Sequence, residues 1–350
     1  MARHGGSHRT HADRGARRQM TGKRSYRAIG LLLAATAANA AAQQQVPPGA
    51  ADMARAMEEA NKVPDTAGDG PYPAVMELDS ALPDHVIYRP ADLTPFAGGK
   101  LGVFAWGNGA CADDGASSRQ HLAEIASYGY LVIAPGKWRS GPNAKVAREA
   151  PRPPAAGERL PPPATTAEDL REGLDFALAE NARSGSRYAN LIDKQAVAVG
   201  GFSCGGLQAI SLAGDPRIST VVVQNSGVFN DTTQSIGGMT VSKDALKTFH
   251  TPVLYLLGGP TDIAYTNGTD DVKRIAHVPV ALVNLPFGHG GTYARPMGGA
   301  AAGIVVDWLE WQLRDNASAG RSFVGANCRL CVNPEATIEL KNFRQGLAGD

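Results

Sequence analysis

Short, continuous apolar runs recur along the middle of the chain, and segments with helical periodicity lie between several of them. The runs cover residues 101–106, 130–135, 197–201, 220–224, 252–257 and 279–284. Strands that are apolar on both sides are typical of parallel sheets, because helices cover both faces of such sheets. The alternation therefore predicts an α/β fold: one domain with a mostly parallel central sheet and helices on both faces.

The flanking sequence predicts how this domain is bounded. Residues 74–78 and 85–89 carry further strand patterns, separated by a turn at 81–84, and the capping-box form of Thr165 to Glu168 predicts the start of a helix. We expect the domain to cover residues 74–316. A linker or loosely ordered arm over 43–73 precedes it, and a tail over 317–350 packs back on it.

The first 42 residues have the pattern of a polar leader and a secretory signal peptide. Basic residues precede an apolar run at 28–35, and Ala38-Asn39-Ala40 matches the small-residue cleavage pattern. Met20 is an alternative translation start, and an uncleaved membrane anchor is the alternative to cleavage. We expect a periplasmic or secreted protein that has no membrane span after cleavage. The formal net charge of +1 gives no reason to expect a nucleic-acid partner.

Four cysteines in an exported chain fit two disulfides. Cys328 and Cys331 are expected to form a small-loop disulfide. A zinc site is the alternative for this pair, but no second pair or histidine cluster nearby would complete it. Cys111 and Cys204 follow strands that should be neighbours, so they are candidates for the second bridge; a buried free thiol at Cys204 is the alternative. We expect no metal and no organic cofactor.

A Gly-x-Ser-x-Gly pattern at 201–205 joins the apolar run at 197–201 to a helical pattern. A tight strand-to-helix turn with glycines on both sides exposes the hydroxyl of its serine, and the first N–H of the helix points at any oxyanion that forms there. Ser203 is therefore a candidate nucleophile, and the Cys204 N–H is a candidate oxyanion donor.

Functional groups of open parallel sheets gather beyond the carboxyl ends of the strands. Of the histidines after the leader, His289 alone follows such an end, so we expect it to be the general base. A base of this kind needs a carboxylate to orient it. Asp262 follows the strand at 252–257 and is the preferred candidate; Asp231 is the alternative.

The loop at 106–109 follows an earlier strand and contains two glycines. Because a tetrahedral intermediate needs at least two donors, we expect the Asn108 N–H to be the second one, although a plain glycine turn is the alternative. Four aromatic residues are candidates either for a substrate pocket or for packing: Trp106, Trp138, Phe229 and Tyr265.

The chain order Ser203, Asp262, His289, together with the serine turn and the donor loop, resembles the α/β-hydrolase superfamily over residues 74–313. Within it, the dienelactone hydrolase, chlorophyllase and secreted polyester-hydrolase branch is the most similar. The segments 258–265 and 288–293 also resemble a group of secreted α/β-hydrolases. Two positions depart from the pattern: Trp106 replaces the usual histidine before Gly107, and dienelactone hydrolases use a cysteine where this chain has Ser203.

The resemblance implies a secreted serine hydrolase that cleaves a small or polymeric carboxylic ester through an acyl-enzyme. Ser203, His289 and Asp262 would form the triad, and the Cys204 and Asn108 amides would bind the oxyanion. One alternative is a peptidase or acyltransferase that uses the same triad. The other is a binding protein that keeps the fold without the chemistry.

Overall fold

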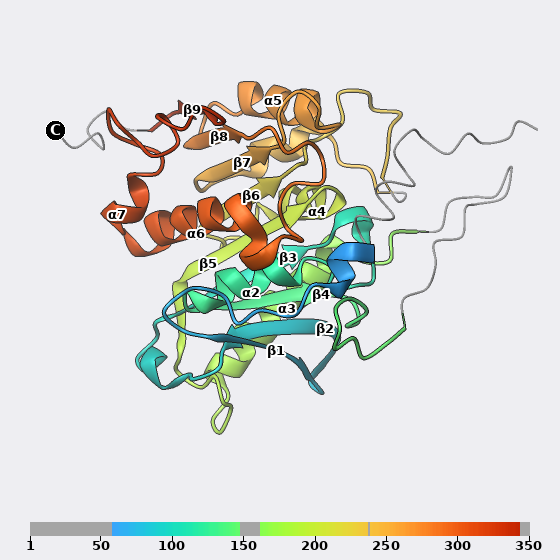
Figure 1. Ribbon diagram of the computed structural model, residues 1–350, viewed down its shortest axis with the longest axis vertical. Coiled ribbons are helices and arrows are strands. Elements are labelled where there is room, and N and C mark those ends of the chain that lie inside the picture. The colour runs from blue at the N-terminus through green and yellow to red at the C-terminus, as the bar shows by residue number, and fades with distance from the viewer. Residues whose placement is uncertain (1–57, 148–161, 237–238, 344–350) are drawn as a thin grey trace, which may run out of the picture. The chain divides into compact units, whose positions relative to one another are not determined.

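A nine-stranded sheet runs through the computed structural model, which describes residues 58–147, 162–236 and 239–343 (Figure 1). The strands are β1 (Ala74–Asp79), β2 (Leu82–Pro90), β3 (Leu101–Gly107), β4 (Tyr130–Pro135), β5 (Ile192–Phe202), β6 (Thr220–Gln224), β7 (Val253–Leu257), β8 (Val280–Asn284) and β9 (Thr337–Lys341). Their spatial order is β1-β2-β4-β3-β5-β6-β7-β8-β9. The strands from β4 to β8 in this order pair in parallel, so the predicted mostly parallel α/β sheet is confirmed.

Helices cover both faces of this sheet. They are α2 (Arg119–Ser127), α3 (Ala167–Ala182), α4 (Cys204–Leu212), α5 (Tyr265–Arg274), α6 (Gly299–Arg314) and α7 (Ala317–Gly320). Short 3-10 turns occur at η1 (Thr94–Phe96), η2 (Gly109–Cys111), η3 (Lys243–Thr248) and η4 (Pro296–Gly298). The helices α3, α4 and α5 pack on one face of the sheet, in the same core as Val103 of β3. The helices α2 and α6 pack on the other face, in the same core as Phe104. Figure 1 shows α2 and α6 side by side. Successive residues of β3 thus enter separate cores, as the period of two in a strand requires.

Two boundaries differ from the sequence expectations. β2 begins at Leu82, inside the segment predicted as a turn, because Asp79 pairs directly with Leu82 and leaves only a tight turn between the strands. The capping box of α3 begins one residue later than predicted, at Thr166, whose side chain accepts from Glu168 N–H while Asp169 Oδ2 accepts from Thr166 N–H at 2.6 Å. Thr165 is buried instead, and its N–H donates to the Cys111 carbonyl.

The predicted leader and signal peptide, and part of the arm at 43–73, lie outside the described residues. Within the part of the chain that the structure describes, no helix is long and apolar enough to cross a membrane.

The carboxyl-terminal segment contributes a strand that the sequence did not predict. β9 pairs antiparallel with β8 at the outer edge of the sheet. The Lys341 ammonium donates to the carbonyls of Val272 and Lys273, at 2.7 and 3.0 Å, and so ties β9 to the end of α5. Phe323, which is 1% exposed, stacks on Trp311 at 5.6 Å between ring centroids and packs edge-on against Trp308.

Replacing Phe323 with alanine tests how much this aromatic packing contributes. Phe323→Ala should lower the free energy of unfolding by about 3–5 kcal/mol, because it removes a buried ring and leaves a cavity. Urea unfolding followed by tryptophan fluorescence measures the change. Leu340→Ala, on the partly exposed face of β9, is the control and should cost less than about 1 kcal/mol. Equal losses in the two variants would contradict this assignment of the packing.

Candidate active site

Ser203 lies at the sharp turn between β5 and α4. Its backbone has φ 55° and ψ −117°, a conformation that costs a non-glycine residue on the order of 1–3 kcal/mol. The neighbouring backbones are so close that a Cβ on Gly201 would collide with Gly205, and one on Gly205 would collide with the Gly107 carbonyl. The glycines of the pattern are therefore required by close backbone approach, and they allow a turn that places Ser203, which is 8% exposed, at the carboxyl end of the sheet.

The structure brings Ser203, His289 and Asp262 together at this edge. Ser203 Oγ lies 3.0 Å from His289 Nε2, and His289 Nδ1 lies 2.7 Å from Asp262 Oδ1. An ionised carboxylate can only accept, so Nδ1 carries the proton and Nε2 is free to accept from the serine hydroxyl. The three side chains form one hydrogen-bonded line that can move a proton away from Ser203 Oγ.

The Asp262 carboxylate is buried and fully hydrogen-bonded. Besides His289, Oδ1 accepts from the Ala264 N–H at 2.9 Å, while Oδ2 accepts from the Gly258 N–H at 2.9 Å and from Asn225 Nδ2 at 2.8 Å. Burial acts to raise the pKa of Asp262, but the hydrogen bonds from His289 and the two backbone N–H groups outweigh it and lower that pKa below its usual value. Asp262 therefore stays charged and keeps the imidazole oriented.

Asn225 connects the loops that carry Asp262 and His289. Its Nδ2 donates both to Asp262 Oδ2 and to the Gly288 carbonyl at 3.0 Å, and its Oδ1 accepts from the buried hydroxyl of Tyr293. Sequence reasoning missed both residues. A signal for Asn225 was nevertheless present, because it directly follows the carboxyl end of β6, the position from which the other site residues were selected.

Two backbone N–H groups lie at the start of α4, next to the serine turn. Cys204 is the first residue of α4, so its N–H has no acceptor within the helix. A Cβ on Gly205 would lie 2.7 Å from the Asn108 nitrogen, which places that nitrogen against the start of α4. The Asn108 side chain holds its own loop, because Nδ2 donates to the Pro135 and Ala112 carbonyls at 2.6 and 3.0 Å.

The four aromatic candidates for a pocket have different surroundings. Trp106 is fully buried and packs against the rings of His121 and Tyr293, so it is a packing residue. Trp138 is also buried, and its Nε1 donates to the Ser140 carbonyl at 3.1 Å. Phe229 and Tyr265 are partly exposed and pack at the margin of the core that α3, α4 and α5 cover.

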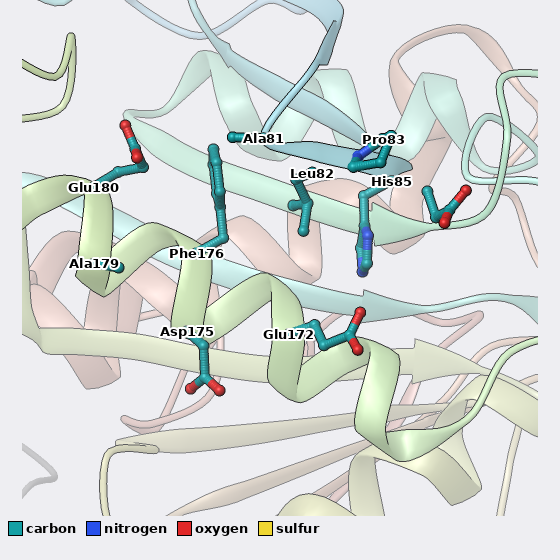
Figure 2. A pocket seen from close by; sticks show the side chains of 10 residues that line it. Ala81, Leu82, Pro83, His85, Glu172, Asp175, Phe176, Ala179 and Glu180 are labelled. Carbon is teal, nitrogen blue, oxygen red and sulfur yellow. The ribbon is translucent and has the colours of Figure 1, made fainter.

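A hollow of the domain lies away from these residues. Its volume is about 520 Å³. Figure 2 shows side chains that line it from β2 and α3, with Leu82 and Phe176 apolar and Glu172 acidic. Ser203, Asp262 and His289 do not line it. Of the carboxylates around it, Asp84 pairs with Lys137, Asp175 with Arg217 and Glu180 with Arg183, so a bound cation would have to compete with these partners.

The remaining sequence candidates have clear positions. Asp231 is exposed and accepts from Thr233, whereas His289 contacts Asp262.

Both predicted disulfides are confirmed: Cys111 is bonded to Cys204, and Cys328 is bonded to Cys331. This excludes a zinc site at Cys328 and Cys331 and a free thiol at Cys204. Within residues 58–147, 162–236 and 239–343, no three His, Cys, Asp or Glu side chains are grouped as metal ligands.

No protein-family model matches this sequence, and no curated protein is significantly similar to it. What this protein does is therefore inferred from its residues and their geometry.

Substituting the glycine after the serine turn tests the close approach of the two backbones. Gly205→Ala should lower the free energy of unfolding by about 1–3 kcal/mol or more, because its Cβ has no space beside Gly107. Gly303→Ala is a matched control in α6, where nothing lies within 4 Å of the added carbon, and it should be neutral or stabilising by up to about 1 kcal/mol. Thermal or urea unfolding measures both changes, and an unaffected Gly205→Ala protein would contradict the contact.

Proposed function

We propose that this protein is a secreted serine hydrolase of the α/β-hydrolase superfamily that cleaves a carboxylic ester through an acyl-enzyme. The observation that carries the proposal is the hydrogen-bonded line from Asp262 through His289 to Ser203, which ends on a serine held in a strained turn. The position of that serine, after a central strand and before a helix, supports the superfamily assignment.

In the first step, the Ser203 hydroxyl attacks the ester carbonyl while His289 Nε2 takes its proton. The carbonyl π electrons move to oxygen, which becomes an oxyanion within reach of the Cys204 and Asn108 N–H groups. Asp262 stabilises the imidazolium and keeps its proton on Nδ1. When the tetrahedral intermediate collapses, His289 gives its Nε2 proton to the leaving alcohol and the acyl group stays on Ser203.

In the second step, His289 removes a proton from water, and the resulting nucleophile attacks the acyl carbonyl. The same two N–H groups bind the second oxyanion, and its collapse releases the carboxylic acid while the Ser203 oxygen takes the proton back from His289. Apart from water and the ester, the proposed steps use only side chains and backbone amides of the chain. Two disulfides support the proposal of export, because such bonds persist in oxidising compartments.

Removing the nucleophile tests this function directly. Ser203→Ala should lower kcat for p-nitrophenyl acetate by about 10⁵- to 10⁶-fold and abolish labelling by a fluorophosphonate probe, since no other oxygen occupies the end of the hydrogen-bonded line. Ser211→Ala, an exposed serine on the same helix, should keep wild-type turnover and labelling. If Ser203→Ala is still labelled, the assignment of the nucleophile to Ser203 fails. If the wild type is not labelled, a binding function on the same fold becomes the better explanation.

A carboxylate exchange separates the two acidic candidates. Asp262→Asn should lower kcat by about 10⁴-fold, because an amide no longer holds the imidazole in the required tautomer. Asp231→Asn should stay within about twofold of wild type, because among the described residues the Asp231 carboxylate bonds only to its own turn. Steady-state ester hydrolysis compares them, and circular dichroism checks that both variants fold. The opposite ranking would assign the orienting carboxylate to Asp231.

A further inference from the structure

The Cys111–Cys204 disulfide joins the two segments that carry the proposed oxyanion donors. Cys204 is itself one donor residue, and Cys111 ends the short η2 turn that follows the other, Asn108. We propose that this disulfide is a positioning device, which keeps the Asn108 and Cys204 N–H groups at the separation that an oxyanion needs. The inference rests on the proposed function and adds to it how the donor pair is held.

The η2 turn has a backbone that needs support from outside. Ala110 and Cys111 have φ angles of 55° and 48°, so two successive non-glycine residues occupy the left-handed region. This conformation is unfavourable for residues with a Cβ, and a loop that was free to relax would leave it. Any relaxation would reach Asn108, because the Cys111 N–H donates to the Asn108 carbonyl at 3.2 Å.

The support for η2 comes largely from α4. In addition to the disulfide from Cys204, Gln208 Nε2 lies 3.0 Å from Cys111 Sγ and donates to the Thr165 carbonyl at 2.6 Å. The Thr165 N–H in turn donates to the Cys111 carbonyl at 3.0 Å. The first turns of α4 therefore hold both the sulfur and the backbone of Cys111.

The glycines at this contact explain why a covalent bond is useful there. Gly107 and Gly205 touch through their backbones, and neither has a side chain that could lock one segment to the other. Sliding of the loop along α4 would change the position of the Asn108 N–H relative to the Cys204 N–H. A displacement of about 1 Å at a catalytic group can cost on the order of 10²-fold in rate. The disulfide prevents this displacement.

The second disulfide provides a matched control. Both bonds involve a buried cysteine: Cys328 is 1% exposed, and Cys111 and Cys204 are 0% exposed. The control pair differs in that Cys331 is exposed and the pair lies in the carboxyl-terminal segment. The test compares the kcat of the double variant Cys111→Ala/Cys204→Ala with that of the double variant Cys328→Ala/Cys331→Ala. The first variant should lose about 10²-fold in kcat for p-nitrophenyl acetate, with KM within about threefold and slower fluorophosphonate labelling of Ser203. The control should keep kcat within about twofold.

A reduction experiment tests the same bond without a substitution at the site. In the Cys328→Ala/Cys331→Ala protein the only disulfide is Cys111–Cys204. Tris(2-carboxyethyl)phosphine breaks the Sγ–Sγ bond by supplying two electrons; the two sulfurs take up two protons, and the phosphine becomes its oxide with oxygen from water. We expect kcat to fall in proportion to the two thiols that appear, while near-ultraviolet circular dichroism stays native, and to recover on reoxidation with diamide.

The outcomes separate this inference from the proposed function. If the wild type hydrolyses esters and the reduced protein keeps full kcat with two free thiols, the positioning role is wrong and the hydrolase stands. Activity lost only together with the native circular dichroism signal would show general stabilisation and would also overturn the positioning role. A wild type that neither hydrolyses esters nor reacts with fluorophosphonate would remove both proposals.

Discussion

The end of β3 and the first turn of α4 meet in direct backbone contact at Gly107 and Gly205, and the arrangement of the site depends on that contact. It places the loop after β3 beside the first N–H groups of α4, and it is compatible only with residues that lack a Cβ. The serine turn, the Asn108 loop and the Cys111–Cys204 disulfide are all arranged around it. A parallel sheet makes the contact available, because β3 and β5 end at the same edge.

Asp262 and His289 reach this edge on separate loops, and side-chain hydrogen bonds connect those loops. Asn225 binds the Asp262 carboxylate and the Gly288 carbonyl simultaneously, while Tyr293 orients its amide. The arrangement leaves Asp262 buried with its charge compensated by donors, which is the condition for a carboxylate to stay ionised away from water. Preorganisation at the site thus comes from residues that need not contact a substrate.

Much of the site could be predicted from the sequence because it depends on local pattern and on one rule of sheet topology. Gly201 and Gly205 identified the serine turn, and position after a strand end selected His289 and Asp262. Asn225 and Tyr293 were missed because their roles depend on contacts between distant loops. The role of Trp106 stayed open for the same reason: an aromatic residue at a strand end suits a pocket or a core equally. β9 was missed because its exposed outer face weakens the apolar pattern of a strand.

The antiparallel pairing of β9 with β8 has a consequence for how the domain behaves in a crowded solution. The last parallel strand would otherwise present a row of unpaired N–H and C=O groups, which is a template for strand addition and aggregation. β9 occupies that row, and as a short strand with the charged residues Glu339 and Lys341 it makes a poor template in its turn. The carboxyl-terminal segment therefore leaves no parallel strand unpaired at this edge of the sheet.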